Sequence, residues 1–180
     1  LESNQILSAK YLLDLAHLLK VSRELKNYFK ENTLGTSHQE NSEENSSILQ
    51  DYFLSLYANL SIEKEIFDKI LDENTISDNA SSKLASLRRN RKNLEQGIKE
   101  KLTSLIHSAN YSKYLMEPVI TLRNNRYVIP VKQEYRSSIQ GFIHDISSSG
   151  STVYLEPTSV FETNNQIASI RMEEEIEIEK

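Results

Sequence analysis

Residues 118–157 are the stretch that most constrains the fold, because they alone carry strand chemistry in a chain otherwise typical of helix. Two runs suited to extended structure, 119–123 and 126–132, flank the dipeptide Asn124-Asn125. Asparagine tolerates the positive φ that a two-residue hairpin turn requires. The pattern therefore predicts an antiparallel hairpin that turns at these two asparagines.

A two-residue turn also fixes the register of this hairpin. It sets Leu122 opposite Tyr127 and Arg123 opposite Arg126. Like charges directly opposed across two strands repel each other. The arginine pair is therefore expected to need an acidic neighbour or an external anion.

A second hairpin is predicted directly after the first. Its strands are residues 139–146 and 151–156, joined by three serines and Gly150, which can take the left-handed conformation of a turn. Together the two hairpins predict a small antiparallel sheet of about four strands over residues 118–157.

The rest of the chain shows helical periodicity. A long amphipathic helix is predicted over 3–30, and shorter ones over 48–60 and 62–71. Between them, the polar segment 31–47 has few residues that a core could bury, which predicts a mobile loop. Residues 1–77 are therefore interpreted as a helical core segment.

Two helices of opposite charge are predicted on either side of the sheet. Residues 78–117 hold a basic amphipathic helix that leads into it, and residues 158–180 hold an acidic helix that leaves it. An antiparallel arrangement would bring Arg88 beside Glu177 and Arg91 beside Glu174. The predicted fold class is mainly α with a small antiparallel β element: a helical core and two long antiparallel lever helices that carry a β clamp.

The charge distribution supports that division. The net charge is −5, yet residues 81–140 hold twelve Lys and Arg against four Asp and Glu, which leaves nine basic and twenty-two acidic residues elsewhere. A basic middle between acidic ends is expected of a segment that binds a polyanion, and equally of two complementary helices.

Several classes of protein are disfavoured by composition. The chain has no cysteine, which excludes a disulfide framework and thiolate metal sites. No apolar run approaches the ~20 residues of a membrane span, so we expect a cytoplasmic protein with no membrane partner. The first residue is not Met, and 172–180 is helical in character without a terminating Gly or Pro, so a segment of a longer protein is expected.

Enzymatic chemistry is not expected in this segment. The four glycines form no phosphate-binding loop, the four histidines have no metal-ligand spacing, and neither a catalytic residue nor a metal site is predicted. His144 and Asp145 precede three serines, but adjacent residues of a strand point to opposite faces. We interpret this segment as a turn whose serines bond their own backbone, with His144 packed beside Val153.

Nucleic-acid binding is the better hypothesis for the sheet. Cations and aromatic rings together suit a sugar-phosphate backbone and its bases. The candidates in the sheet region are Arg123, Arg126, Lys132, Arg136 and Tyr135, and a secondary basic group on the helix is Arg88, Arg89, Arg91 and Lys92. Alternatively, Arg123 and Arg126 pair internally with Glu117, Glu134 or Glu156, and the cations of the helix pair with the acidic helix.

The order of motifs from about residue 74 to residue 180 resembles a known family. It is similar to the arm and clamp of the second bacterial MutS subfamily, whose full-length members end in an Smr nuclease domain. Residues 1–70 fit that family only as generic core helices. The matching motifs are Arg126-Tyr127-Val128, Pro130-Val131-Lys132, Glu134-Tyr135-Arg136, His144-Asp145, Ser147 to Gly150, Glu156-Pro157 and Asn164-Asn165.

The resemblance implies a function for the parent protein that lies mostly outside this chain. It implies a homodimeric ATPase and endonuclease that uses ATP and Mg²⁺ and acts on branched DNA or on stalled or collided ribosomes. In that reading the chain is a lever and clamp with no cofactor of its own, and its partner is DNA or ribosomal RNA. The alternative is a purely structural helical arm or interaction module that makes no direct contact with nucleic acid.

Overall fold

A computed structural model describes residues 7–33 and 51–179. The chain divides into two compact units, Leu1–Ser81 and Ser82–Lys180, which we call unit 1 and unit 2 and describe separately. Most of the predicted loop 31–47 lies outside the described residues, and its first three residues continue a helix. In the described part of the chain, no helix combines the length and apolar character needed to cross a membrane.

Unit 1 is built on two packed helices, α1 (Ala9–Thr33) and α3 (Leu60–Lys69). Asn59 caps α3, since its side chain accepts hydrogen bonds from the backbone of Ser61 and Ile62, as its residue type predicts. Arg23 of α1 binds both carboxylate oxygens of the buried Glu63 on α3 at 2.8 Å. A bidentate ion pair therefore fixes how these helices pack.

A small hairpin follows α3 where the sequence predicts only the end of a helix and an irregular break. The helix stops at Lys69, and β1 (Ile70–Asp72) pairs with β2 (Thr75–Ile76). The Asp72 carboxylate accepts a hydrogen bond from the Asn74 backbone at 2.8 Å, which stabilises the turn. A short 3₁₀ turn over Asp78–Ala80 then follows and is capped by Ser77, whose side chain accepts from the Asn79 backbone.

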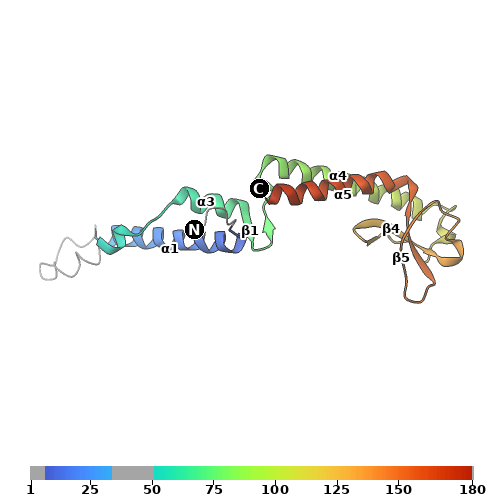
Figure 1. The fold of residues 1–180 in the computed structure, drawn as a ribbon, viewed down its shortest axis with the longest axis horizontal. Helices are drawn as coiled ribbons and strands as arrows, with labels where there is room; N and C mark the ends of the chain where they lie inside the picture. Colours follow the sequence, from blue (N-terminus) through green and yellow to red (C-terminus); the bar gives the residue numbers. More distant parts are fainter. Residues whose placement is uncertain (1–6, 34–50, 180) are drawn as a thin grey trace, which may run out of the picture. The chain divides into compact units, whose positions relative to one another are not determined.

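In unit 2, helices α4 (Ser82–Ile106) and α5 (Thr158–Ile178) lie side by side and antiparallel (Figure 1). Arg91 of α4 donates to Glu174 of α5 at 2.7 Å, as predicted, and Arg88 lies 3.9 Å from the same carboxylate. Lys83 also pairs with Glu177, and Glu95 with Arg171. Residue numbers therefore increase along α4 as those of their partners decrease along α5. Opposite charge thus sets the register of the two helices.

The ends of α4 and α5 meet a four-stranded antiparallel sheet of order β3-β4-β6-β5. In the first hairpin the register matches the prediction, with Leu122 opposite Tyr127 and Arg123 opposite Arg126, and both turn asparagines have positive φ. Gly150 in the second turn also has positive φ, of 72°. The strands are β3 (Thr121–Arg123), β4 (Arg126–Lys132), β5 (Gly141–Ile146) and β6 (Thr152–Pro157).

The core of unit 2 lies between the helix pair and one face of this sheet. Alternate residues of β4 and β6 point into it, as the two-residue period of a strand requires. Helices and sheet therefore form one packed body, mainly α with a small antiparallel β element, which confirms the predicted fold class. The residues at its centre are Ile98, Leu102, Tyr127, Ile129, Val131, Val153, Leu155, Val160 and Ile167.

Candidate nucleic-acid interface

The two opposed arginines of the first hairpin point to different carboxylates. Arg126 binds Glu156 of β6, while Arg123 lies 3.2 Å from Asp145 of β5. Each like-charged neighbour thus has its own acidic partner, as the register led us to expect. The two arginines differ greatly in their surroundings, so they are described in turn.

Arg126 sits in a buried polar network. Its Nε and Nη2 donate to the two oxygens of Glu156, each at 2.8 Å, and Nη2 also donates to the Asn165 side chain at 2.8 Å. The Glu156 side chain is fully buried. Arg126 is thus committed to an internal carboxylate, Glu156, which is the internal pairing that the sequence left open as the alternative to a nucleic-acid contact.

Asn164 links this network to the backbone of β4. Its Nδ2 donates to Glu156 at 2.6 Å and to the Tyr127 carbonyl at 3.2 Å, and its Oδ1 accepts from the Tyr127 N–H at 3.1 Å. His144 Nε2 lies 2.5 Å from Glu156 Oε2. Because an ionised carboxylate can only accept, His144 is the donor in that pair. The network therefore joins α5 to three strands.

The Glu156 carboxyl is held in its charged form. Burial is the largest single influence and would raise its pKa, but the hydrogen bonds from Arg126, Asn164 and His144 together outweigh burial. The pKa of Glu156 is therefore lowered from its ordinary value. A carboxylate with this environment can stabilise the fold only while it is ionised.

Acid is expected to remove this stabilisation. Because the pKa of Glu156 is lower in the folded than in the unfolded chain, its contribution is fully present above the unfolded value of about 4.3 and is lost as the pH falls through the folded value. Urea unfolding between pH 7 and pH 3 should show a steeper loss of stability in the wild type than in Glu156→Gln. Parallel curves for the two proteins below pH 4.3 would contradict this assignment.

Arg123 is only half-buried and lies on the face of the sheet away from the core. Its guanidinium stacks 3.9 Å from the centroid of the Tyr154 ring, in addition to the Asp145 contact. Arg123, Tyr154, Thr121 and Met116 help to line an open hollow of about 240 Å³. This arginine is therefore reachable by a ligand, unlike Arg126.

A second group of cations lies near the end of β4, which we call the cation–aromatic cluster: Lys113, Tyr114, Lys132, Tyr135 and Arg136. The rings of Tyr114 and Tyr135 are 5.1 Å apart, and each has a lysine Nζ within 5.9 Å of its centroid. Lys132 donates to the Lys113 carbonyl at 3.3 Å. Among the described residues, no carboxylate forms an ion pair with the three cations of this cluster.

The predicted secondary basic group on α4 also contains both cations that pair within the chain and cations that are exposed. Arg88 and Arg91 are half-buried and face Glu174 of α5, so they hold the helices together. Arg89 and Lys92 are exposed. Only the second pair therefore presents charge to a ligand.

The turn between β5 and β6 does not assemble a nucleophilic site. Ile146, rather than the predicted His144, lies opposite Val153, and His144 is the extra residue of a bulge between Ile143 and Asp145, where it meets Glu156. Ser147 Oγ accepts from the Thr152 backbone at 3.1 Å, in line with the predicted turn role. Within residues 7–33 and 51–179, no group of three or more potential ligands could hold a metal ion.

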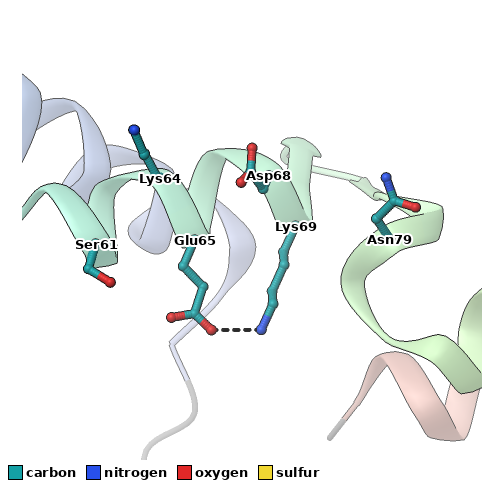
Figure 2. A pocket seen from close by; sticks show the side chains of 6 residues that line it. All are labelled: Ser61, Lys64, Glu65, Asp68, Lys69 and Asn79. Atoms are coloured by element: carbon teal, nitrogen blue, oxygen red, sulfur yellow. Dashed lines mark hydrogen bonds and ion pairs between the residues drawn. The ribbon is translucent and has the colours of Figure 1, made fainter.

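An open hollow with a volume of about 710 Å³ lies in unit 1 (Figure 2). It is lined by residues of α3 together with Asn79. Figure 2 shows the Glu65 carboxylate bonded to Lys69, a pair 2.7 Å apart. Because its positive and negative side chains balance and are exposed, this hollow offers no built anion or metal site.

Sequence reasoning missed Lys113 and Tyr114 as members of the candidate interface. They sit in a short 3₁₀ turn, Ser112–Tyr114, which the sequence places at the end of the predicted basic helix. The isolated bridge between Leu115 and Val131 brings that turn beside β4. The only signal in the sequence was the Lys-Tyr dipeptide shortly before Pro118.

Comparison with known proteins gives a consistent result. No protein-family model matches the chain. It is 43% identical over 179 residues to an endonuclease MutS2 of Acetivibrio thermocellus and 41% identical over 180 residues to that of Ruminiclostridium cellulolyticum. A third, from Clostridioides difficile, is 42% identical over 169 residues.

These matches cover 94–100% of this chain but only 20–22% of each relative. The chain therefore spans about a fifth of the length of the curated relatives that it matches. The similarity includes the first 70 residues, for which the motifs alone gave no specific resemblance. Over nearly its whole length, the chain corresponds to one segment of the endonuclease MutS2 proteins, which confirms the predicted resemblance to the second bacterial MutS subfamily.

Proposed function

We propose that unit 2 is a lever and clamp that binds a nucleic-acid backbone through the cation–aromatic cluster, with Arg123 as a further contact. One observation carries this proposal: the cluster holds three cations without a carboxylate partner among the described residues, beside two tyrosine rings. Cations of this kind release counterions from phosphates, and tyrosines offer surfaces on which bases stack.

The connection between the helix pair and the sheet supports the lever. Arg171 of α5 donates to Glu95 of α4 at 3.2 Å and to the Asn125 carbonyl in the β3–β4 turn at 3.2 Å. Glu95 in turn binds Arg91, which binds Glu174. A continuous chain of hydrogen bonds therefore runs from both helices into the hairpin, so that a movement of the helices would be passed to the sheet.

The similarity to endonuclease MutS2 extends the proposal to the parent protein. The parent would be a cytoplasmic homodimer that binds ATP and Mg²⁺ and cleaves nucleic acid through domains outside this chain. Its targets would be branched DNA, in suppressing homologous recombination, or stalled and collided ribosomes. The segment itself would contribute grip and transmission rather than catalysis.

The proposal predicts a salt-dependent loss of binding on removing the cluster cations. The triple variant Lys113→Ala, Lys132→Ala, Arg136→Ala of the full-length protein should bind a four-way DNA junction about tenfold or more weakly at low salt. The slope of log affinity against log salt should become shallower by about 2 to 3, since each phosphate contact contributes ~0.9. Fluorescence anisotropy over a salt series measures both quantities, and competition with purified ribosomes distinguishes DNA from ribosomal RNA as the preferred target.

A matched control uses three exposed lysines of unit 1, Lys20, Lys30 and Lys64. Their replacement by alanine removes the same charge without touching the cluster, so affinity and slope should stay close to wild type. The same dependence of affinity on salt concentration in the cluster variant and the wild type would contradict the proposal.

The same result would favour the second candidate, a purely structural arm. That candidate is supported by four arginines of unit 2, namely Arg88, Arg91, Arg126 and Arg171, whose charges meet carboxylates or carbonyls of the chain itself. In this case contact with nucleic acid would come from domains outside the chain.

A further inference from the structure

Helix α1 exposes a regular apolar face in unit 1, which we call the outer seam: Tyr11, Leu15, Leu18, Val21 and Leu25. The exposed fractions of these side chains range from 38% to 64%. Their spacing of four, three, three and four residues places them along one side of the helix. Scattered apolar residues on a surface are ordinary, but a contiguous apolar row this long marks a contact surface.

The seam is not the face that packs on α3. The buried residues of α1 are Ala16 and Leu19, and the neighbouring Arg23 binds Glu63 of α3. Successive residues of an α-helix are turned by about 100°, which puts these positions well away from Leu18 and Leu25. Helix α1 is therefore apolar on two sides, of which one is covered.

The described part of unit 1 also buries few apolar side chains. Among the described residues of unit 1, only Ala16, Leu19 and Ile70 are buried hydrophobic side chains, whereas the described part of unit 2 buries fifteen. A domain core is usually a contiguous cluster in which each buried residue touches many others. Between residues 7–33 and 51–81, the apolar core is thus much smaller than the core of unit 2.

One charged residue interrupts the seam. Asp14 lies three residues after Tyr11 and four before Leu18, so it shares their face, and it forms no ion pair with any described residue. The seam itself holds no lysine or arginine. A second copy of α1 packed on the seam would therefore cover Asp14 without a basic partner, at the cost of an uncompensated charge.

We infer that the outer seam is covered by an amphipathic helix of the same polypeptide that lies outside these 180 residues, with a lysine or arginine opposite Asp14. The length of the relatives supplies such a helix, since about four-fifths of each lies outside the matched segment. The three- and four-residue spacing of the seam fits a partner helix packed in coiled-coil fashion. This inference does not depend on nucleic-acid binding by unit 2.

Thiol labelling of the full-length protein tests the inference, because this segment has no cysteine of its own. In separate variants, Leu18→Cys and Leu25→Cys place a thiol on the seam, and Asn27→Cys places one at an exposed position of α1 that lies off it. Both seam thiols should react with a maleimide at least about tenfold more slowly than the control thiol. Equal rates at all three positions would overturn the inference.

A photoreactive residue identifies what covers the seam. With benzoylphenylalanine in place of Leu18, irradiation of the full-length protein should give a cross-linked peptide from the same polypeptide, outside these 180 residues, found by mass spectrometry. A cross-link to α1 of another copy, formed only between differently labelled chains, would show that the occupant is a second protomer and overturn the inference. Absence of any cross-link in a seam whose thiols are unprotected would do the same.

Discussion

Arg126→Ala is expected to lower the free energy of unfolding of unit 2 by about 3 kcal/mol or more. The substitution leaves the fully buried Glu156 carboxylate without its bidentate partner, and it also removes the hydrogen bond to Asn165. Removing one member of a buried ion pair costs far more than the pair contributes, because the remaining charge is buried without compensation.

Hydrogen exchange at the amides of β4 and β6, read as a function of urea, reports the stability of unit 2 separately from that of unit 1. Arg136→Ala is the matched control: it removes the same side chain from an exposed position with no ion pair to a described carboxylate, and it should change stability by no more than about 0.5 kcal/mol. Combining Arg126→Ala with Glu156→Gln should recover part of the loss, because the buried charge is then gone. Equal effects of Arg126→Ala and Arg136→Ala would refute the buried network.

Arg126 and Arg136 show that the sequence alone does not distinguish an internally paired arginine from an exposed one. Both are arginines near tyrosines in a basic stretch, and the sequence nominated both as contacts for nucleic acid. The partners that separate them lie 30 and 39 residues further along the chain, at Glu156 and Asn165. Charge patterning shows where cations are concentrated, but only the tertiary pairing decides which of them are neutralised.

The first hairpin could be predicted in detail because its determinants are local. Two asparagines that accept positive φ fix the turn, and a two-residue turn fixes which residues oppose each other. The Arg91–Glu174 pair could be predicted as well, since two helices of opposite charge that leave one sheet have few alternative registers. Local chemistry and periodicity thus account for most of the architecture of unit 2.

The parts that could not be predicted depend on subtler signals. Residues 70–76 form a hairpin of only two residue pairs, too short for any alternation to stand out. The bulge in β5 leaves His144 as the extra residue between Ile143 and Asp145, where it meets Glu156, and its predicted neighbour Val153 lies opposite Ile146 instead. In both places one residue decides the geometry, and a pattern averaged over many residues does not resolve it.

Gly141→Ala is expected to destabilise unit 2 by about 3 kcal/mol, the upper part of the range for overpacking, although Gly141 lies at the exposed start of an edge strand. A Cβ at this position would collide with the Glu156 carbonyl oxygen and with the Leu155 side chain. The carbonyl belongs to the backbone of β6 and cannot move without disturbing the Glu156 carboxylate and the pairing of Gly141 with Pro157. The substitution should therefore loosen β5 and the buried network together.

Gly97→Ala is the matched control, because a Cβ there meets no atom within 4 Å. Gly97 lies inside α4, where alanine has the better helix propensity, so this variant should gain about 0.5–1 kcal/mol. The same substitution should thus have opposite effects on stability at these two exposed or half-exposed positions. The melting temperature of Gly141→Ala should lie below that of the wild type, and the melting temperature of Gly97→Ala above it. Should Gly141→Ala melt at or above the wild-type temperature, β5 cannot lie as close to β6 as the structure has it, and the placement of His144 on Glu156 would fall with it.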